Sequence, residues 1–123
     1  MPFELAKTFR FESAHRLPHV PDGHKCGRLH GHSFRFEVVV TGDLDAHTGW
    51  VVDYGDISDV VRPIVDALDH RYLNDIPGLE NPTSEVLCAW LWQKLAGGLP
   101  GLSAITVRET CTTACTYRGP KHT

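Results

Sequence analysis

The sequence lacks the features of several large classes of protein. Its 12 lysines and arginines are outnumbered by 15 aspartates and glutamates, and the net charge of −3 offers no basic footprint for a nucleic acid. No apolar run reaches the length of about 18 residues that a membrane span needs, and the first residues lack a signal-peptide pattern. The four cysteines lack the setting of a small secreted disulfide scaffold. We therefore expect a cytoplasmic protein with reduced thiols and no membrane partner.

Apolar residues recur with strand periodicity at both ends of the chain and with helix periodicity in the middle. The 123 residues are enough for a single domain, 1–123, with one hydrophobic core. The expected elements are a strand through Phe9–His15, a strand over 30–40, a short strand over 50–53, helices over about 55–68 and from Thr83 to Gly97, and strands over 104–109 and 116–118. Pro63 is expected to kink the first helix or to shift its start. This order predicts an α+β fold, in which two helices cover one face of an antiparallel sheet.

Three histidines share the buried faces of the two long strands. His30 and His32 continue the parity of the apolar residues that follow them, and His15 continues that of Phe9 and Phe11. Each histidine alone would be read as a hydrogen-bonded residue at a strand end. Together they predict a metal site, and three neutral imidazoles with an open fourth position are typical of catalytic zinc, although imidazole ligands also suit nickel, copper and iron.

Cys26 lies close to these histidines and has two possible roles. As a fourth ligand it would close the site and make the zinc structural. As a free thiol it would lie beside His24, Lys25 and Arg28, whose positive charge favours the thiolate, and a thiolate can act as a general base. The residues alone leave this choice open.

Two further acidic positions stand out. Asp69 and His70 close the first predicted helix, where they could end it or form a pair that moves protons near neutral pH. Glu109 shares the face of Ile105 and Val107, and a carboxylate there could grip a planar N–H edge such as that of a guanine or pterin ring. It could also turn outward to solvent.

The order of these motifs resembles the 6-pyruvoyltetrahydropterin synthase superfamily over about residues 9–119. The matching motifs are His15, the run Cys26–His32, Leu68–His70, Asn81–Glu85 and Glu109–Cys111. Three residues separate Cys26 from His30, as in the bacterial branch of 6-carboxy-5,6,7,8-tetrahydropterin synthases of the queuosine (7-deazaguanine) pathway, whereas animal pyruvoyl synthases have five. The run over 73–83 is also typical of that branch.

The resemblance implies a tunnelling fold, in which a four-stranded antiparallel sheet and two helices assemble into homo-oligomeric barrels, commonly trimers stacked into hexamers. It implies a lyase that converts 7,8-dihydroneopterin triphosphate to 6-carboxytetrahydropterin, releasing acetaldehyde and triphosphate. By resemblance, His15, His30 and His32 hold zinc and Cys26 is the proton-abstracting base. Asp69 and His70 form a relay that a neighbouring subunit supplies, and Glu109 anchors the pterin ring. Candidate cations for the triphosphate are Lys25, Arg28, Arg118 and Lys121.

Overall fold

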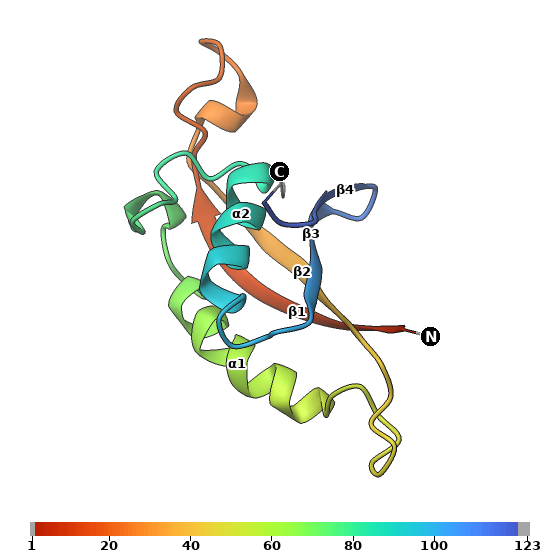
Figure 1. Cartoon of the computed structure of the whole chain (residues 1–123). Coiled ribbons are helices and arrows are strands. Elements are labelled where there is room, and N and C mark those ends of the chain that lie inside the picture. The colour runs from red at the N-terminus through yellow and green to blue at the C-terminus, as the bar shows by residue number, and fades with distance from the viewer. Residues whose placement is uncertain (1, 121–123) are drawn as a thin grey trace.

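Four antiparallel strands form one sheet in the order β1-β2-β3-β4, and both helices pack on the same face of it (Figure 1). The computed structural model describes residues 2–120. The strands are β1 (Phe3–His15), β2 (His30–Gly42), β3 (Leu102–Thr110) and β4 (Thr113–Tyr117), and the helices are α1 (Tyr54–Leu68) and α2 (Ser84–Leu95). Short 3-10 turns cover Lys25–Gly27 and Leu73–Asp75. The predicted α+β architecture is confirmed.

The core lies between the sheet and the helices, and it follows the strand parity that the sequence predicts. Phe9 lies opposite Phe36 and Phe11 opposite Phe34, and the two pairs stack with ring centroids 5.5 and 4.9 Å apart. Cross-strand aromatic pairs of this kind hold the register of an antiparallel pair, because a shift by one residue would turn every buried side chain outward. This register also determines which residues meet at the end of the sheet.

Helix α1 begins at a polar cap and continues through its proline. The Asp53 side chain accepts a hydrogen bond from the Gly55 amide at 2.9 Å, which satisfies one of the free N–H groups of the first turn. Pro63 lies on the exposed side of the helix, whereas Ile57 and Val61 are fully buried against the sheet. The helix remains continuous because the missing N–H faces solvent rather than the core.

The short strand expected over 50–53 is absent, and this prediction was wrong. The segment bends back in a turn in which the Asp45 amide donates to the Trp50 carbonyl at 2.9 Å and the Asp45 carboxylate accepts from the amides of His47 and Thr48. Trp50 is nearly half exposed. Local hydrogen bonds of an aspartate therefore outweigh the β propensity of the valines that follow.

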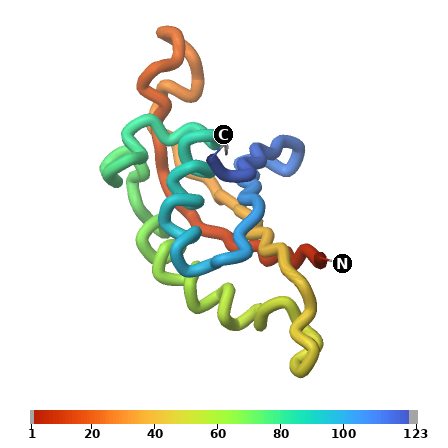
Figure 2. The backbone as a smooth tube through the Cα atoms, in the orientation of Figure 1, coloured from red at the N-terminus to blue at the C-terminus, as the bar shows by residue number. Residues whose placement is uncertain are grey.

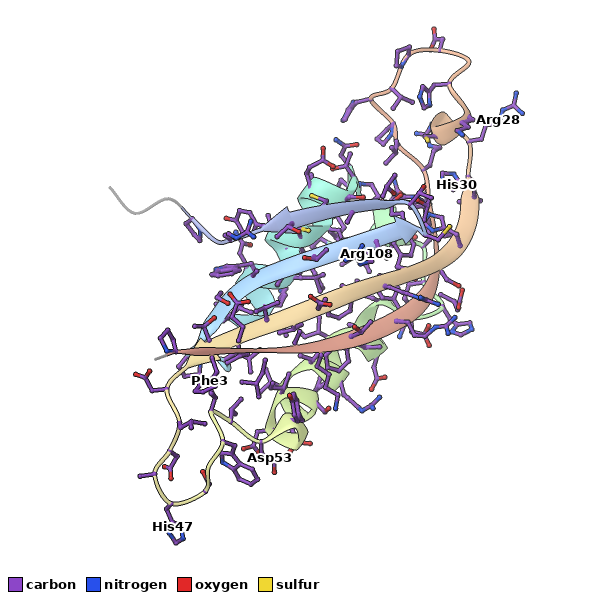
Figure 3. The ribbon with its side chains drawn as sticks, turned by 90° about the vertical axis from the view of Figure 1, so that its right-hand side faces the viewer. Phe3, Arg28, His30, His47, Asp53 and Arg108 are labelled. Atoms are coloured by element: carbon purple, nitrogen blue, oxygen red, sulfur yellow. The ribbon has the colours of Figure 1, made fainter. Side chains whose placement is uncertain are left out.

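Two long loops project from opposite ends of the sheet, as the tube in Figure 2 shows. One, between β1 and β2, contains Cys26, and the other, between β2 and α1, contains His47 at its tip (Figure 3). In residues 2–120 there is no helix long and apolar enough to cross a membrane.

Candidate metal centre and active site

The three predicted histidines come together at one end of the sheet, close to where the Cys26 loop leaves it. The β1–β2 register sets His15 directly opposite His30 and Ser13 opposite His32, so the two β2 histidines flank the His15 ring. One ligand nitrogen from each ring lies within 4.8 Å of the other two. His15 is almost fully buried, while His30, labelled in Figure 3, and His32 are half-buried.

Each imidazole has its Nδ1 atom against a main-chain carbonyl oxygen. The carbonyls and the Nδ1···O distances are Pro82 at 3.1 Å for His15, Arg28 at 2.8 Å for His30, and Ser33 at 3.2 Å for His32. A carbonyl oxygen only accepts, so each Nδ1 holds the proton and each Nε2 keeps its lone pair. Main-chain carbonyls are common partners of metal-bound histidines, because they set the tautomer and the ring orientation.

The Nε2 atoms of His15 and His32 are only 3.1 Å apart. With both protons on Nδ1, two lone pairs face each other there, and a shared cation relieves that repulsion. Burial lowers the pKa of His15, although its bond to the Pro82 carbonyl acts in the opposite direction, so the neutral form is favoured. Tetrahedral zinc, with Zn–N bonds of about 2.0–2.1 Å, holds its nitrogens roughly 3.3 Å apart, and this donor set therefore suits it.

Cys26 faces the same cavity as His30 and His32. Its Sγ atom does not belong to the group of possible metal ligands found among residues 2–120, which consists of the three histidines. The cavity has a volume of about 440 Å³ and is lined by Lys25, Cys26, His30, His32, Glu109 and Thr110. The thiol is half-buried and free. A short turn holds it in place, because the Cys26 amide donates to His24 Nδ1 at 3.0 Å and the Gly27 amide to the His24 carbonyl at 3.0 Å.

Glu109 points inward at the end of β3, as its parity predicts. Its Oε1 atom accepts a hydrogen bond from the Ser84 hydroxyl at 2.7 Å, and its Oε2 atom lies 3.9 Å from His32 Nε2. The β3–β4 register shifts between Val107 and Thr110, so this stretch departs from regular pairing with β4 beside the cavity. One oxygen is thus held from the first turn of α2, and the carboxylate is positioned toward the cavity.

Asp69 and His70 form a pair, but within one chain they lie away from the Cys26 cavity. The Asp69 Oδ2 atom is 2.9 Å from His70 Nδ1, and Oδ1 accepts the Glu12 amide at 2.9 Å. The Glu12 amide and then the His70 hydrogen bond lower the pKa of Asp69. His70 lines a separate cavity of about 550 Å³, beside β1, that shares only His32 with the first.

The main chain of His70 is in an unfavourable conformation. Its φ of 56° lies in the left-handed region, which a residue with a Cβ seldom adopts, and its amide donates to the Glu12 carbonyl at 2.6 Å. The imidazole is 78% exposed. Such conformations are most often retained where they aim a functional side chain, and the exposed His70 ring lines the second cavity together with residues of β1 and β2.

The candidate cations do not form one group. Lys25 lines the Cys26 cavity, while Arg28 lines a small cavity inside the loop over 16–28. Arg118 is exposed beyond β4, and Lys121 lies outside the described residues.

The sequence does not predict three of the contacts at this site. Ser84 and the Pro82 carbonyl come from the start of α2, far along the chain from the residues they touch, so no local pattern links them. His24 caps a turn, although histidine is not a usual capping residue. In this region the sequence predicts only that a helix begins after Thr83, and the structure confirms Thr83 as the N-cap of α2.

Comparison with known proteins gives consistent results. A family model described as 6-pyruvoyl tetrahydropterin synthase matches residues 4–120. A Synechocystis protein named 6-carboxy-5,6,7,8-tetrahydropterin synthase is 49% identical in an alignment of 123 positions, which covers 95% of this chain and 94% of that protein. A Haemophilus influenzae protein of the same name is 34% identical over 113 residues, covering 87% of this chain and 74% of the relative.

A solved structure resembles the fold over nearly its whole length. The Caenorhabditis elegans 6-pyruvoyl tetrahydropterin synthase has a TM-score of 0.89 and 26% identity, with 98% of this chain and 97% of that chain covered. The sheet with two helices on one face is therefore the fold of that structure too.

Proposed function

Because the chain belongs to the 6-pyruvoyl tetrahydropterin synthase family, we propose that it is a zinc-dependent lyase of queuosine (7-deazaguanine) biosynthesis in the cytoplasm. Its reaction would convert 7,8-dihydroneopterin triphosphate to 6-carboxy-5,6,7,8-tetrahydropterin, with release of acetaldehyde and triphosphate. The relatives from Synechocystis and Haemophilus influenzae are named as pterin synthases, which supports a role in pterin synthesis. The observation behind the finer proposal is the single cavity that brings a thiol and a carboxylate beside two of three converging histidines.

His15, His30 and His32 would hold the zinc through Nε2, since their Nδ1 protons are engaged by carbonyls. Bound there, zinc would supply Lewis acidity to the side-chain oxygens of the substrate and make the neighbouring C–H groups easier to deprotonate. The three ligands come from two paired strands, and the register of those strands sets their spacing.

Cys26 would act as the general base, with Sγ accepting a proton from the substrate side chain. Its place in the cavity but outside the cluster of ligand nitrogens supports this role over that of a fourth ligand. Glu109 would bind the N–H and NH₂ edge of the pterin ring through the carboxylate that Ser84 orients. Binding the ring at one end and the side chain at the other would fix which carbon lies against the thiol.

Asp69 and His70 would serve the site of a neighbouring subunit in a homo-oligomeric barrel. The exposed imidazole, its left-handed main chain and its separate cavity support this assignment. Asp69 would hold the proton on His70 Nδ1 and leave Nε2 to exchange protons with substrate. Mixing Cys26→Ala and His70→Ala subunits tests the arrangement, because a site built from two chains should recover about a quarter of the wild-type turnover.

The decisive test is incubation with dihydroneopterin triphosphate, followed by product analysis of wild type and Cys26→Ala. We expect acetaldehyde and carboxytetrahydropterin from the wild type, and retained zinc with lost turnover in the variant. Absence of acetaldehyde would exclude the proposed reaction. A pyruvoyl product would indicate the alternative pyruvoyltetrahydropterin synthase activity on the same substrate, which the spacing of Cys26 from His30 disfavours. Loss of zinc and of the fold in Cys26→Ala would indicate a closed structural site instead.

A further inference from the structure

Three arginines lie side by side on the open face of the sheet, opposite the helices. The register pairs Arg10 on β1 with Arg35 on β2, and Arg35 with Arg108 on β3. We call these three residues the arginine row. All are exposed, and Figure 3, which views the sheet with the helices behind it, labels Arg108 on β3. Residues directly opposite on adjacent strands have Cβ atoms about 4.5–5.5 Å apart, so the side chains are neighbours.

Like charges placed directly opposite one another destabilise a sheet, and acidic residues offset little of this charge. Glu12 lies 3.5 Å from the Arg10 guanidinium, and the Ser33 hydroxyl donates one hydrogen bond that its two carboxylate oxygens share. Glu37 lies in the next row of the same face, opposite Thr8 and Thr106. Within residues 2–120, no carboxylate lies within ion-pair distance of the other two arginines. The row is thus a concentrated positive charge on a chain whose net charge is −3.

We propose that the arginine row is a binding site for a linear triphosphate group, with inorganic tripolyphosphate as its simplest form. A guanidinium binds phosphate through two parallel N–H···O bonds, and three on adjacent strands form an array roughly 10 Å long. A chain of phosphates can contact all three guanidinium groups at once, and it carries more negative charge than a single phosphate. The site lies on the face opposite the cavity of Cys26, and it does not depend on the proposed reaction.

The test measures tripolyphosphate binding by calorimetry in variants of one background. Lys25→Gln and Arg28→Gln form the background, because they remove the cations near the Cys26 cavity that would also attract the anion. Arg35→Gln removes the centre of the row. Arg62→Gln is the matched control, since Arg62 is an exposed arginine on α1, on the other side of the sheet, and the net charge changes equally.

We expect Arg35→Gln to weaken tripolyphosphate binding at least tenfold and Arg62→Gln to leave it within twofold. Orthophosphate should bind at least tenfold more weakly than tripolyphosphate, and ATP should bind like tripolyphosphate if the triphosphate group alone is recognised. Equal affinities of the two variants would overturn the proposal, as would equal binding of orthophosphate and tripolyphosphate. If ATP binds more tightly than tripolyphosphate and still does so in Arg35→Gln, ATP binds elsewhere on the protein. That result would also overturn the proposal.

A second measurement tests the repulsion on which the argument rests. Without ligand and at low salt, Arg35→Gln should melt about 2–4 °C above Arg62→Gln, because two like-charge pairs are relieved. The difference should fade at about 0.5 M salt, where exposed charges are screened. If the Tm of Arg35→Gln is equal to or below that of Arg62→Gln, the arginines of the row do not repel one another measurably. The reason for expecting a bound anion is then lost.

Discussion

The cluster of three histidines predicts a large stabilisation of the protein by zinc. One ligand nitrogen of each ring lies within 4.8 Å of the other two, and the Nε2 atoms of His15 and His32 are 3.1 Å apart, so a shared cation would remove the repulsion between their lone pairs. Free zinc at a thousand times its Kd would add about 4 kcal/mol to the free energy of unfolding. For 123 residues, with an unfolding entropy of about 2.1 cal/mol/K per residue, this corresponds to a rise in Tm of roughly 16 °C.

The assay is a thermal melt of metal-free protein with and without buffered zinc. His30→Ala is the test variant, because His30 is half-buried and its replacement leaves the buried His15 ring in place. Losing one ligand should weaken binding at least about a hundredfold, since even loss of an outer hydrogen bond to a ligand costs about 10–100-fold, and the rise should fall to roughly 5 °C. His47→Ala, at the tip of an exposed loop, is the control and should keep the full rise (Figure 3).

The same reasoning predicts the tautomers of the metal-free protein. Nitrogen NMR at about pH 8 should find Nδ1 protonated and Nε2 unprotonated in His15, His30 and His32, because each Nδ1 faces a carbonyl oxygen. The reasoning is refuted if zinc leaves the melt unchanged, if His30→Ala keeps the whole rise, or if two of the three rings hold their proton on Nε2.

Three further predictions concern residues outside the ligand set. Burial raises the pKa of the Cys88 thiol to about 12, so the unfolded chain loses this proton at lower pH than the folded protein does. The free energy of unfolding should therefore fall as the pH rises above about 9. Urea unfolding between pH 8 and 11 should show this fall in the wild type and not in Cys88→Ala. Pro63→Ala should stabilise the protein by about 2 kcal/mol in urea unfolding, because an exposed mid-helix position regains its N–H, and a loss of stability would mean that the ring is needed there. His24→Ala should lower turnover about tenfold with zinc content unchanged, because the Cys26 amide loses its hydrogen-bond acceptor. His24→Asn can accept the same hydrogen bond and should retain most of the turnover. Equal activity of the two variants would show that His24 does not position Cys26.

Much of the fold could be predicted because its strands and helices have regular burial. The parity of Phe9, Phe11 and His15 is confirmed by the β1–β2 register, and the Thr83 cap begins α2 as expected. The error over 50–53 has a local cause, since the hydrogen bonds of one aspartate side chain shape a turn that hydrophobic periodicity cannot reveal.

The sequence by itself determined the spacing of the chemistry: a thiol and two imidazoles within seven residues, a third imidazole on a strand of matching parity, and a carboxylate on the inner face of another. Strand periodicity is enough for this, because alternate residues must point to the same side. Only the tertiary structure decided which of these groups share a cavity. It brought the histidines together, with the Pro82 carbonyl against His15 and the Ser84 hydroxyl against Glu109, and it placed His70 in a second cavity that shares only His32 with the cavity of Cys26. It also aligned the three arginines across strands that are distant in sequence. These contacts depend on register and on the docking of α2, which arise from packing of the whole core and leave no mark in any short stretch of sequence.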